Sequence, residues 1–372
     1  MSDKRHLFDE WGRLSQNRSL VNCIFIHRFP QWGDWRRMGD KKLRSDIVNL
    51  RVVAILAVIF GHSTTIYWYN WTDYRTTQEA PVFAHVGNLA MLVLGLWMLI
   101  SGFCVGFTLR GKKRFKDFFI KRFSRLVIPY WLVALIWMIP IRLLIEYPGY
   151  EGQSFLYILW KNIFLGYDNG QLWYLPTLFF YSLIAWFINF CLKKFKWADI
   201  FAFAISVMML IFYTKYTWHG ASLMRSPTLS PFFLYFSFFM LGFILFNHEA
   251  TIRKYITKPL LVVGFVLMLI AIGFMYMGRG GTFVQLIAVW LCLVVIFFLM
   301  PNKSNKFTRT LAEVSLGVYL FHEPLAFISY TYWPDINPLL MVSINFFIWG
   351  TVASIISYFV FVFPKKIMRK KA

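Results

Sequence analysis

Long apolar runs, separated by short polar or basic segments, dominate the hydropathy pattern of the chain. A helix needs about 20 mostly apolar residues to cross a bilayer. The stretch 154–166 is apolar but shorter than that, so we expect it to lie at the interface or to re-enter the membrane. Runs of sufficient length predict ten membrane-spanning helices, at roughly 47–68, 87–109, 126–146, 172–192, 198–214, 230–247, 259–277, 282–300, 312–331 and 338–362.

The composition supports the same fold class. Of the 372 residues, 58% are hydrophobic and 15% are charged, whereas soluble domains are about 45–50% apolar. We therefore expect an all-α, polytopic helix bundle embedded in a lipid bilayer. The pattern divides the chain into a basic and aromatic N-terminal extension (1–45), a membrane domain (46–364) and a basic tail (365–372).

The positive charges are distributed unevenly between the two sides of the predicted bundle. Of the 39 lysines and arginines, 32 lie in the two termini and in alternate loops, and eight of these are in the stretch 110–125. This asymmetry follows the positive-inside rule and predicts that both termini are cytoplasmic. The net charge of +22 is therefore explained by the orientation of the chain in an inner or plasma membrane. No nucleic acid is expected as a partner.

The cysteines give no sign of a metal site. Cys23, Cys104, Cys191 and Cys292 are scattered, without a CxxC pair or a zinc-ligand spacing. We expect no metal and no bound cofactor.

Two ionisable residues bracket an apolar stretch in the first predicted span, RVVAILAVIFGH, from Arg51 to His62. Eleven residues correspond to about 1100° of helix, within roughly 20° of three full turns, so both side chains share one face. Their separation along the axis is about 16 Å, half of a hydrocarbon core of about 30 Å. Arg51 is thus expected near the cytoplasmic end of the face and His62 beyond the midplane.

This pair is compatible with several roles. Arg51 could simply extend its head to the inner headgroups, and His62 could be a packing residue. A guanidinium, however, binds phosphate, and a neutral imidazole can accept a proton from a hydroxyl. The combination suits acyl transfer from cytoplasmic acyl-CoA to an acceptor on the other side. A proton-coupled transporter or flippase of a lipid-linked glycan, with His62 as the relay, is the alternative, and a structural membrane subunit is a third.

Five segments, in order, resemble the acyltransferase 3 family of integral membrane acyltransferases. The first, LRSDIVNLRVVAILAVIFGHS, contains the Arg-x10-His pair of that family. The others are LISGFCVGF (99–107), FKDFFIKRFSRLVIPYW (115–131), QLWYLPTLFF (171–180) and LAEVSLGVYLFHEPL (311–325). They place Lys121, Arg122, Arg125, Pro129, Tyr130, Ser315, Tyr319 and His322 on family motifs.

The resemblance implies a ten-helix membrane enzyme that O-acylates carbohydrates, commonly exopolysaccharide or lipopolysaccharide. It implies that His62 and Arg51 are functional. Many members have a histidine before the Leu-Trp-Tyr motif, where this chain has Gln171. The N-terminal extension is not part of the family pattern.

From these inferences we expect direct transfer of an acyl group, most simply acetyl from acetyl-CoA, to a hydroxyl of a carbohydrate or glycolipid acceptor. Arg51 and the pair Arg122 and Arg125, three apart on one helix face, are expected to bind the donor phosphates. His62 is expected to act as general base. Side chains expected to line the site, including donors to an oxyanion, are Ser101, Trp173, Tyr174, Tyr319 and His322.

Overall fold

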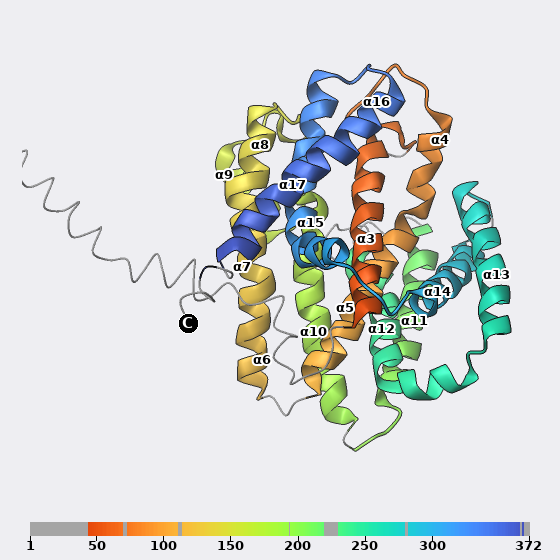
Figure 1. Cartoon of the computed structure of the whole chain (residues 1–372). Coiled ribbons are helices and arrows are strands. Elements are labelled where there is room, and N and C mark those ends of the chain that lie inside the picture. Colours follow the sequence, from red (N-terminus) through yellow and green to blue (C-terminus); the bar gives the residue numbers. More distant parts are fainter. Residues whose placement is uncertain are drawn as a thin grey trace, which may run out of the picture.

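The computed structural model describes residues 44–69, 73–110, 114–192, 194–218, 230–279, 282–364 and 367. Every regular element among these residues is a helix, so the predicted all-α bundle is confirmed (Figure 1). The N-terminal extension lies outside the described residues except for Arg44 and Ser45, and so does most of the basic tail.

Nine of the described helical segments are long and apolar enough to cross a membrane. The predicted span at 282–300 corresponds to α14, whose apolar part, Phe283–Leu299, is shorter than the others. The stretch 154–166 contains a shorter apolar helix, Phe155–Phe164, and its position at the interface or re-entering the membrane stays a prediction. The segments that could cross are Ser45–Tyr67, Pro81–Leu109, Phe115–Leu144, Gly170–Cys191, Ala198–Lys215, Ser230–Tyr255, Lys258–Tyr276, Lys306–Tyr332 and Pro338–Val362.

Several of these segments combine α-helix with 3₁₀ or π turns. The elements in chain order are α3 (Ser45–Thr64), η3 (Thr65–Tyr67), α4 (Pro81–Ala84), η4 (His85–Leu89), α5 (Ala90–Leu109), α6 (Phe115–Arg122), η5 (Phe123–Val127), α7 (Ile128–Val133), η6 (Ala134–Met138), α8 (Ile139–Leu144), η7 (Pro148–Tyr150), α9 (Phe155–Leu159), η8 (Trp160–Phe164), η9 (Gly170–Trp173), α10 (Tyr174–Cys191), α11 (Ala198–Trp218), α12 (Ser230–Tyr255), α13 (Lys258–Tyr276), α14 (Thr282–Leu299), α15 (Lys306–Tyr332), α16 (Pro338–Ser343), η11 (Ile344–Trp349), α17 (Gly350–Ser357) and η12 (Tyr358–Val362).

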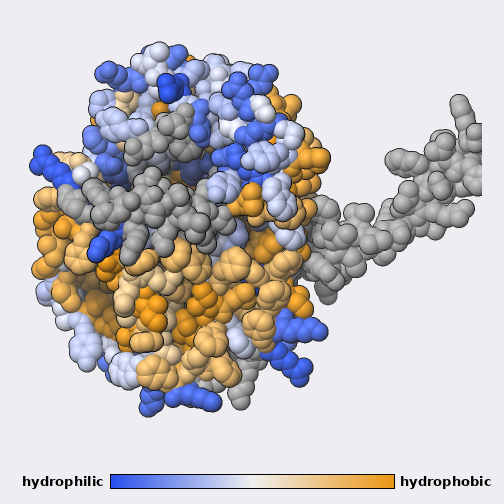
Figure 2. All heavy atoms as spheres, turned by 180° about the vertical axis from the view of Figure 1, so that it is seen from behind, coloured by the Kyte–Doolittle hydropathy of each residue, from blue (hydrophilic) through white to orange (hydrophobic). Residues whose placement is uncertain are grey.

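The helices are arranged around α15. In α15, 83% of the most apolar stretch is buried, whereas in α13 the figure is 17%. Accordingly α15 packs against α3 and α17 near the centre, and α13 lies at the periphery beside α14 (Figure 1). Exposed apolar side chains form a belt between two hydrophilic zones (Figure 2), as expected for a surface in contact with lipid.

Two glycines allow α5 and α12 to come into backbone contact. A Cβ atom at Gly102 would overlap the carbonyl oxygen of Phe239, and one at Gly242 would overlap that of Leu99. Small residues at such crossings let membrane helices approach closely, which is where their van der Waals attraction is gained. This contact fixes α5, which carries several of the predicted site residues.

Prolines account for the π turns of the third span. Pro129 and Pro140 lack an N–H group, and each follows directly after a π turn, η5 or η6. Arg125 lies within η5, and Arg142 lies in α8 just after η6. Such turns shift the register of a helix and so change which side chains face the interior.

One end of the bundle, which we call the basic end, is the end where α3 begins. There Arg44 bonds to Asp46 and to Glu249 of α12, the latter through Nη2 at 2.8 Å. The Asn49 amide donates to the carbonyl oxygens of Pro301 and Lys303, at 2.8 and 2.9 Å. These contacts fix the start of α3 to α12 and to the segment before α15. The other end of the bundle is called the opposite end below.

Candidate active site

His62 of α3 lies opposite a glutamate of α15. The His62 Nδ1 atom is 3.7 Å from Oε1 of Glu323, and Oε2 of Glu323 is 3.6 Å from an Nη atom of Arg142 in α8. The Glu323 and Arg142 side chains are each 2% exposed, whereas the His62 side chain is 22% exposed. The three groups therefore form a row, with two buried charges of opposite sign behind a more accessible imidazole.

Arg142 is held in place from several directions. Its Nη1 atom donates to the carbonyl oxygen of Asp168 at 2.5 Å. Its guanidinium carbon lies 4.5 Å from the ring centroid of Tyr147 and 5.2 Å from that of Phe327. A cation enclosed by ring faces and a carboxylate is stabilised despite its burial. Arg142 thus supplies Glu323 with a fixed counter-charge.

The segment before α10 closes around this ion pair. Gly170 has a φ of +49°, and a Cβ atom there would overlap Oε2 of Glu323 and lie 2.7 Å from Nη2 of Arg142. The next residue, Gln171, directs its backbone N–H toward Oε2 of Glu323 at 3.3 Å. Only a residue without a side chain fits here, because both the backbone conformation and the ion pair exclude one.

Pro324 explains how Gln171 enters the site. A proline in α15 cannot donate the hydrogen bond that the carbonyl oxygen of Leu320, four residues earlier, would otherwise accept. The Gln171 amide donates to that oxygen at 2.9 Å instead, and the Trp137 indole donates to the next carbonyl, Phe321, at 3.1 Å. Gln171 is therefore part of the site wall.

His322 faces His62 rather than Glu323. The two imidazole centroids are 4.9 Å apart, edge to face. Nδ1 of His322 lies 3.0 Å from the carbonyl oxygens of both Val318 and Tyr319. Because carbonyl oxygens only accept, Nδ1 carries the hydrogen and Nε2 of the neutral ring is an acceptor. Among the described residues, the buried Nε2 atom has no hydrogen-bond partner, so the site contains a second basic nitrogen.

The predicted donor residues gather nearer the basic end. The electrostatic neighbours of the Tyr174 hydroxyl include Arg51 and Arg122, and those of Arg122 include Arg125. Arg51 is 6% and Arg122 8% exposed. Buried guanidinium groups that share one neighbourhood favour an anionic ligand. Tyr174 also bonds to Ser101 of α5, so Ser101 and Tyr174 lie in the same region as Arg51 and Arg122.

The hydroxyl groups predicted to stabilise an oxyanion are engaged with one another or with the backbone. Ser101 donates to the carbonyl oxygen of Trp97 at 2.8 Å, so Tyr174 is the donor in its bond with Ser101. Tyr319 donates to the carbonyl oxygen of Gln171. The Trp173 ring stacks on Tyr235 of α12 at 5.1 Å and lies edge to face with the ring of the adjacent Tyr174, at 6.3 Å.

Loops cover the site at the opposite end. Tyr147 donates to Asp73 at 2.5 Å, and Tyr330 donates to the backbone carbonyl of His62. Burial raises the pKa of Tyr147 above its ordinary value, which keeps its hydroxyl protonated and able to donate. Burial likewise raises the pKa of Tyr74 to about 12, and Thr331 of α15 donates to this hydroxyl at 3.3 Å.

Two residues of this site, Glu323 and Arg142, were not predicted from the sequence. Glu323 lies 261 positions after His62 in the chain (323 − 62) and 181 positions after Arg142 (323 − 142). The available signal was that both are charged residues within apolar runs, which by itself marks a functional position.

The fold and this site define a class: a multi-pass helical membrane protein with a His–Glu–Arg row and, nearer the basic end, buried guanidinium groups on α3 and α6. The sequence profile of the Acyl_transf_3 family, an acyltransferase domain, matches residues 44–363. The chain belongs to this family and is a membrane acyltransferase. Comparison with curated proteins and with solved structures gave no match.

Proposed function

We propose that the protein transfers an acetyl group from cytoplasmic acetyl-CoA to a hydroxyl of a cell-surface or exported carbohydrate, at the inner or plasma membrane. The observation that supports this most directly is the distribution of charge along α3. Buried guanidinium groups gather around Arg51, and a His–Glu–Arg row lies at His62, about 16 Å further along the same face.

The donor enters from the basic end. Arg51, Arg122 and Arg125 bind the phosphate groups of CoA through charge-assisted hydrogen bonds. The pantetheine arm is extended and apolar enough to follow the interior of the bundle toward His62. CoA itself remains on the cytoplasmic side, so the acyl group alone crosses.

His62 is the general base. With Nδ1 directed at Glu323, the Nε2 atom accepts the proton of the acceptor hydroxyl while the hydroxyl oxygen attacks the thioester carbonyl. The carboxylate of Glu323 stabilises the imidazolium that forms, and Arg142 stabilises the carboxylate. Collapse of the tetrahedral intermediate breaks the C–S bond, and the proton on His62 passes to the CoA thiolate.

The developing oxyanion requires a donor. Tyr319 is our first candidate, because it lies one turn before His322, with the two ring centroids 6.2 Å apart. Its hydroxyl, which donates to the carbonyl oxygen of Gln171, would donate to the oxyanion instead. His322, with its free Nε2 acceptor, binds a second hydroxyl of the sugar and orients it.

The test is the O-acyl ester content of surface polysaccharide, measured by mass spectrometry in cells with matched membrane levels of each variant. His62→Ala and Glu323→Gln are expected to lower ester content at least a hundredfold, because general-base catalysis contributes about 10²–10⁴-fold. The mass added to the glycan identifies the acyl group.

Glu313→Gln is the matched control, since Glu313 lies on the same helix, about 15 Å nearer the basic end. It is expected to retain ester formation. Equal ester content in wild type and His62→Ala would remove His62 from the chemistry and would favour transport of a lipid-linked glycan.

A further inference from the structure

A hydroxyl group of α15 is bonded to the backbone of the proposed general base. Tyr330 donates to the carbonyl oxygen of His62, and the Thr65 hydroxyl donates to the same oxygen at 2.9 Å. Thr65 begins η3, which continues α3 directly, so its bond moves with that segment. The Tyr330 bond, in contrast, connects the backbone of His62 to a second helix.

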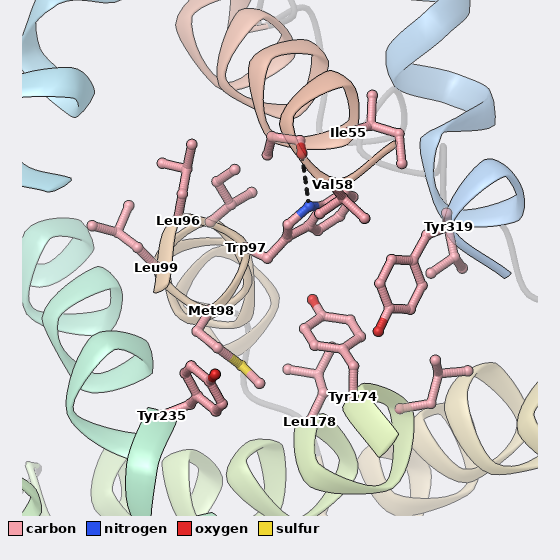
Figure 3. Packing of buried hydrophobic residues seen from close by; sticks show 14 of the residues in the cluster. Ile55, Val58, Leu96, Trp97, Met98, Leu99, Tyr174, Leu178, Tyr235 and Tyr319 are labelled. Atoms are coloured by element: carbon pink, nitrogen blue, oxygen red, sulfur yellow. Dashed lines mark hydrogen bonds between the residues drawn. The ribbon is translucent and has the colours of Figure 1, made fainter. Parts of the chain in front are cut away.

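This bond lies where α3 ends. The helix ends at Thr64, and the last four carbonyl groups of an α-helix have no partner within the helix. Before His62, α3 is fixed by apolar packing, because Ile55 and Val58 point into the buried cluster that also contains Tyr319 of α15 (Figure 3). The Tyr330 hydroxyl adds a directional contact at His62 itself.

The helix α15 contacts His62 at two points. Glu323 faces the imidazole, with 3.7 Å between Oε1 and Nδ1, and Tyr330 binds the backbone. The seven positions from Glu323 to Tyr330 correspond to about 700° of helix, within about 20° of two full turns, so both residues lie on one face. Side chains on a helix tilt toward its N-terminus, which directs the Tyr330 hydroxyl back toward Glu323. One face of α15 therefore holds both the base and its carboxylate partner.

The Tyr330 ring is held independently of its hydroxyl. The side chain is buried, and its ring centroid lies 5.8 Å from that of Tyr74 and 6.2 Å from that of Phe327. Phenylalanine at this position keeps these ring contacts and removes only the bond to His62. The contribution of the hydroxyl can thus be measured without a cavity in the core.

We propose that Tyr330 is a positioning residue, which keeps the His62 imidazole within reach of Glu323 through its bond to the His62 carbonyl. This inference rests on the proposed role of His62 as general base. The 3.7 Å separation leaves little tolerance, because a hydrogen bond requires about 3.2 Å or less. Without the hydroxyl, the end of α3 can shift relative to Glu323, whereas donor binding near Arg51, eleven positions earlier, is not affected.

The experiment uses inside-out membrane vesicles that retain the native carbohydrate acceptor. Radiolabelled acetyl-CoA is supplied over a range of concentrations, and ester formation is expressed per mole of folded protein, counted by thermal unfolding in detergent. Tyr330→Phe is expected to lower kcat about 10–100-fold, since a displacement of about 1 Å can cost 10²-fold. The KM for acetyl-CoA is expected to stay unchanged.

Tyr181→Phe is the matched control. Tyr181 of α10 is also buried, and its hydroxyl donates to the carbonyl oxygens of Pro231 and Phe232 at 2.9 and 2.7 Å. It therefore makes the same kind of bond, but between α10 and α12 rather than between α15 and α3. Tyr181→Phe is expected to lower the unfolding temperature as Tyr330→Phe does, with kcat unchanged.

A double variant shows whether Tyr330 acts through the His62–Glu323 pair. Beside Glu323→Gln, Tyr330→Phe is expected to change kcat by less than about twofold, because no carboxylate remains with which His62 must be aligned. A purely structural role would lower kcat by the same factor in both backgrounds. If Tyr330→Phe does not accumulate, Thr65→Val takes its place: it removes the other hydroxyl from the same carbonyl, and its loss of kcat, about two- to tenfold, should likewise vanish beside Glu323→Gln.

Three results would overturn the inference while leaving acyl transfer intact: wild-type kcat in Tyr330→Phe, an equal loss in Tyr181→Phe, or an equal loss with and without Glu323→Gln. For the substitute variant, wild-type kcat in Thr65→Val has the same meaning. By contrast, a wild-type protein that forms no ester from acetyl-CoA would refute the proposed function itself.

Discussion

At the scale of single residues, the site depends on how buried charges are paired. Glu323 interacts with His62 through one oxygen and with Arg142 through the other. A buried carboxylate without a cation is strongly destabilising, whereas an ion pair replaced as a whole by neutral groups is often tolerated. Variants of the row can therefore distinguish its contribution to stability from its proposed contribution to catalysis.

Arg142→Met is expected to lower the free energy of unfolding by about 3–5 kcal/mol, because it leaves Glu323 buried without its cation. The double variant Arg142→Met with Glu323→Gln is expected to recover most of that loss, since no unpaired charge remains and methionine packs well on the rings around position 142. Ester formation should stay lost in both. Thermal unfolding in detergent and ester analysis are the measurements; a double variant no more stable than Arg142→Met alone would contradict the pairing.

Gly170→Ala is expected to lower thermal stability and ester yield more than alanine at another glycine with a positive φ. Gly152 provides the comparison, because its φ is +68° and a Cβ atom there would meet no atom of the described residues within 4 Å. Both variants incur a backbone cost of about 1–2 kcal/mol, but the methyl at position 170 also displaces the Glu323–Arg142 pair. Midpoints of thermal unfolding and ester yields should both fall further for Gly170→Ala; equal effects would show that the pair tolerates the methyl.

At the scale of elements, the sequence identified the spans because their apolar lengths match a bilayer. It did not identify which spans touch, because lipid and protein neighbours present similar apolar surroundings to a helix face. The α5–α12 contact depends on two glycines 140 residues apart in the chain (242 − 102). It aligns Trp97 and Ser101 of α5 with α3 and α10.

Gly102→Val is expected to separate α5 from α12, because the side chain would overlap the backbone of Phe239. Membrane insertion should persist, since valine remains apolar, while thermal stability falls and ester formation is lost. Gly273→Val in α13 is the control, since in the described part of the chain no atom lies within 4 Å of a Cβ atom placed there. Membrane content, unfolding temperature and ester yield measure these effects, and a Gly102→Val protein as stable as Gly273→Val would refute the close contact.

At the scale of the whole molecule, the bundle has two chemically distinct ends. The basic end carries the start of α3 and the ion pairs of Arg44, whereas the opposite end is covered by loops tied together through Asp73, Tyr147 and Asp335. The positive-inside rule predicts that the basic end is cytoplasmic. Under the proposed function, the donor would then enter from the cytoplasm and the acceptor from the other side of the membrane.

This topology predicts opposite labelling of two exposed positions. In a chain whose native cysteines are replaced, Glu151→Cys is expected to react with a membrane-impermeant maleimide in intact cells, because it lies in a loop of the opposite end. Lys116→Cys, at the start of α6, should react only after the membrane is permeabilised. Labelling of position 116 in intact cells would reverse the orientation and with it the proposed direction of acyl transfer.

The sequence by itself determined the fold class and nearly all of the spans, because hydropathy and the length of apolar runs are local properties of the chain. It also predicted that Arg51 and His62 share one face of α3, from helical periodicity. Only the tertiary structure decided that Glu323 and Arg142 complete the row at His62, that Gln171 replaces the hydrogen bond lost at Pro324, and that the Trp97 indole of α5 bonds to the backbone of α3. Those relations depend on the packing of helices far apart in the sequence, which no local pattern encodes.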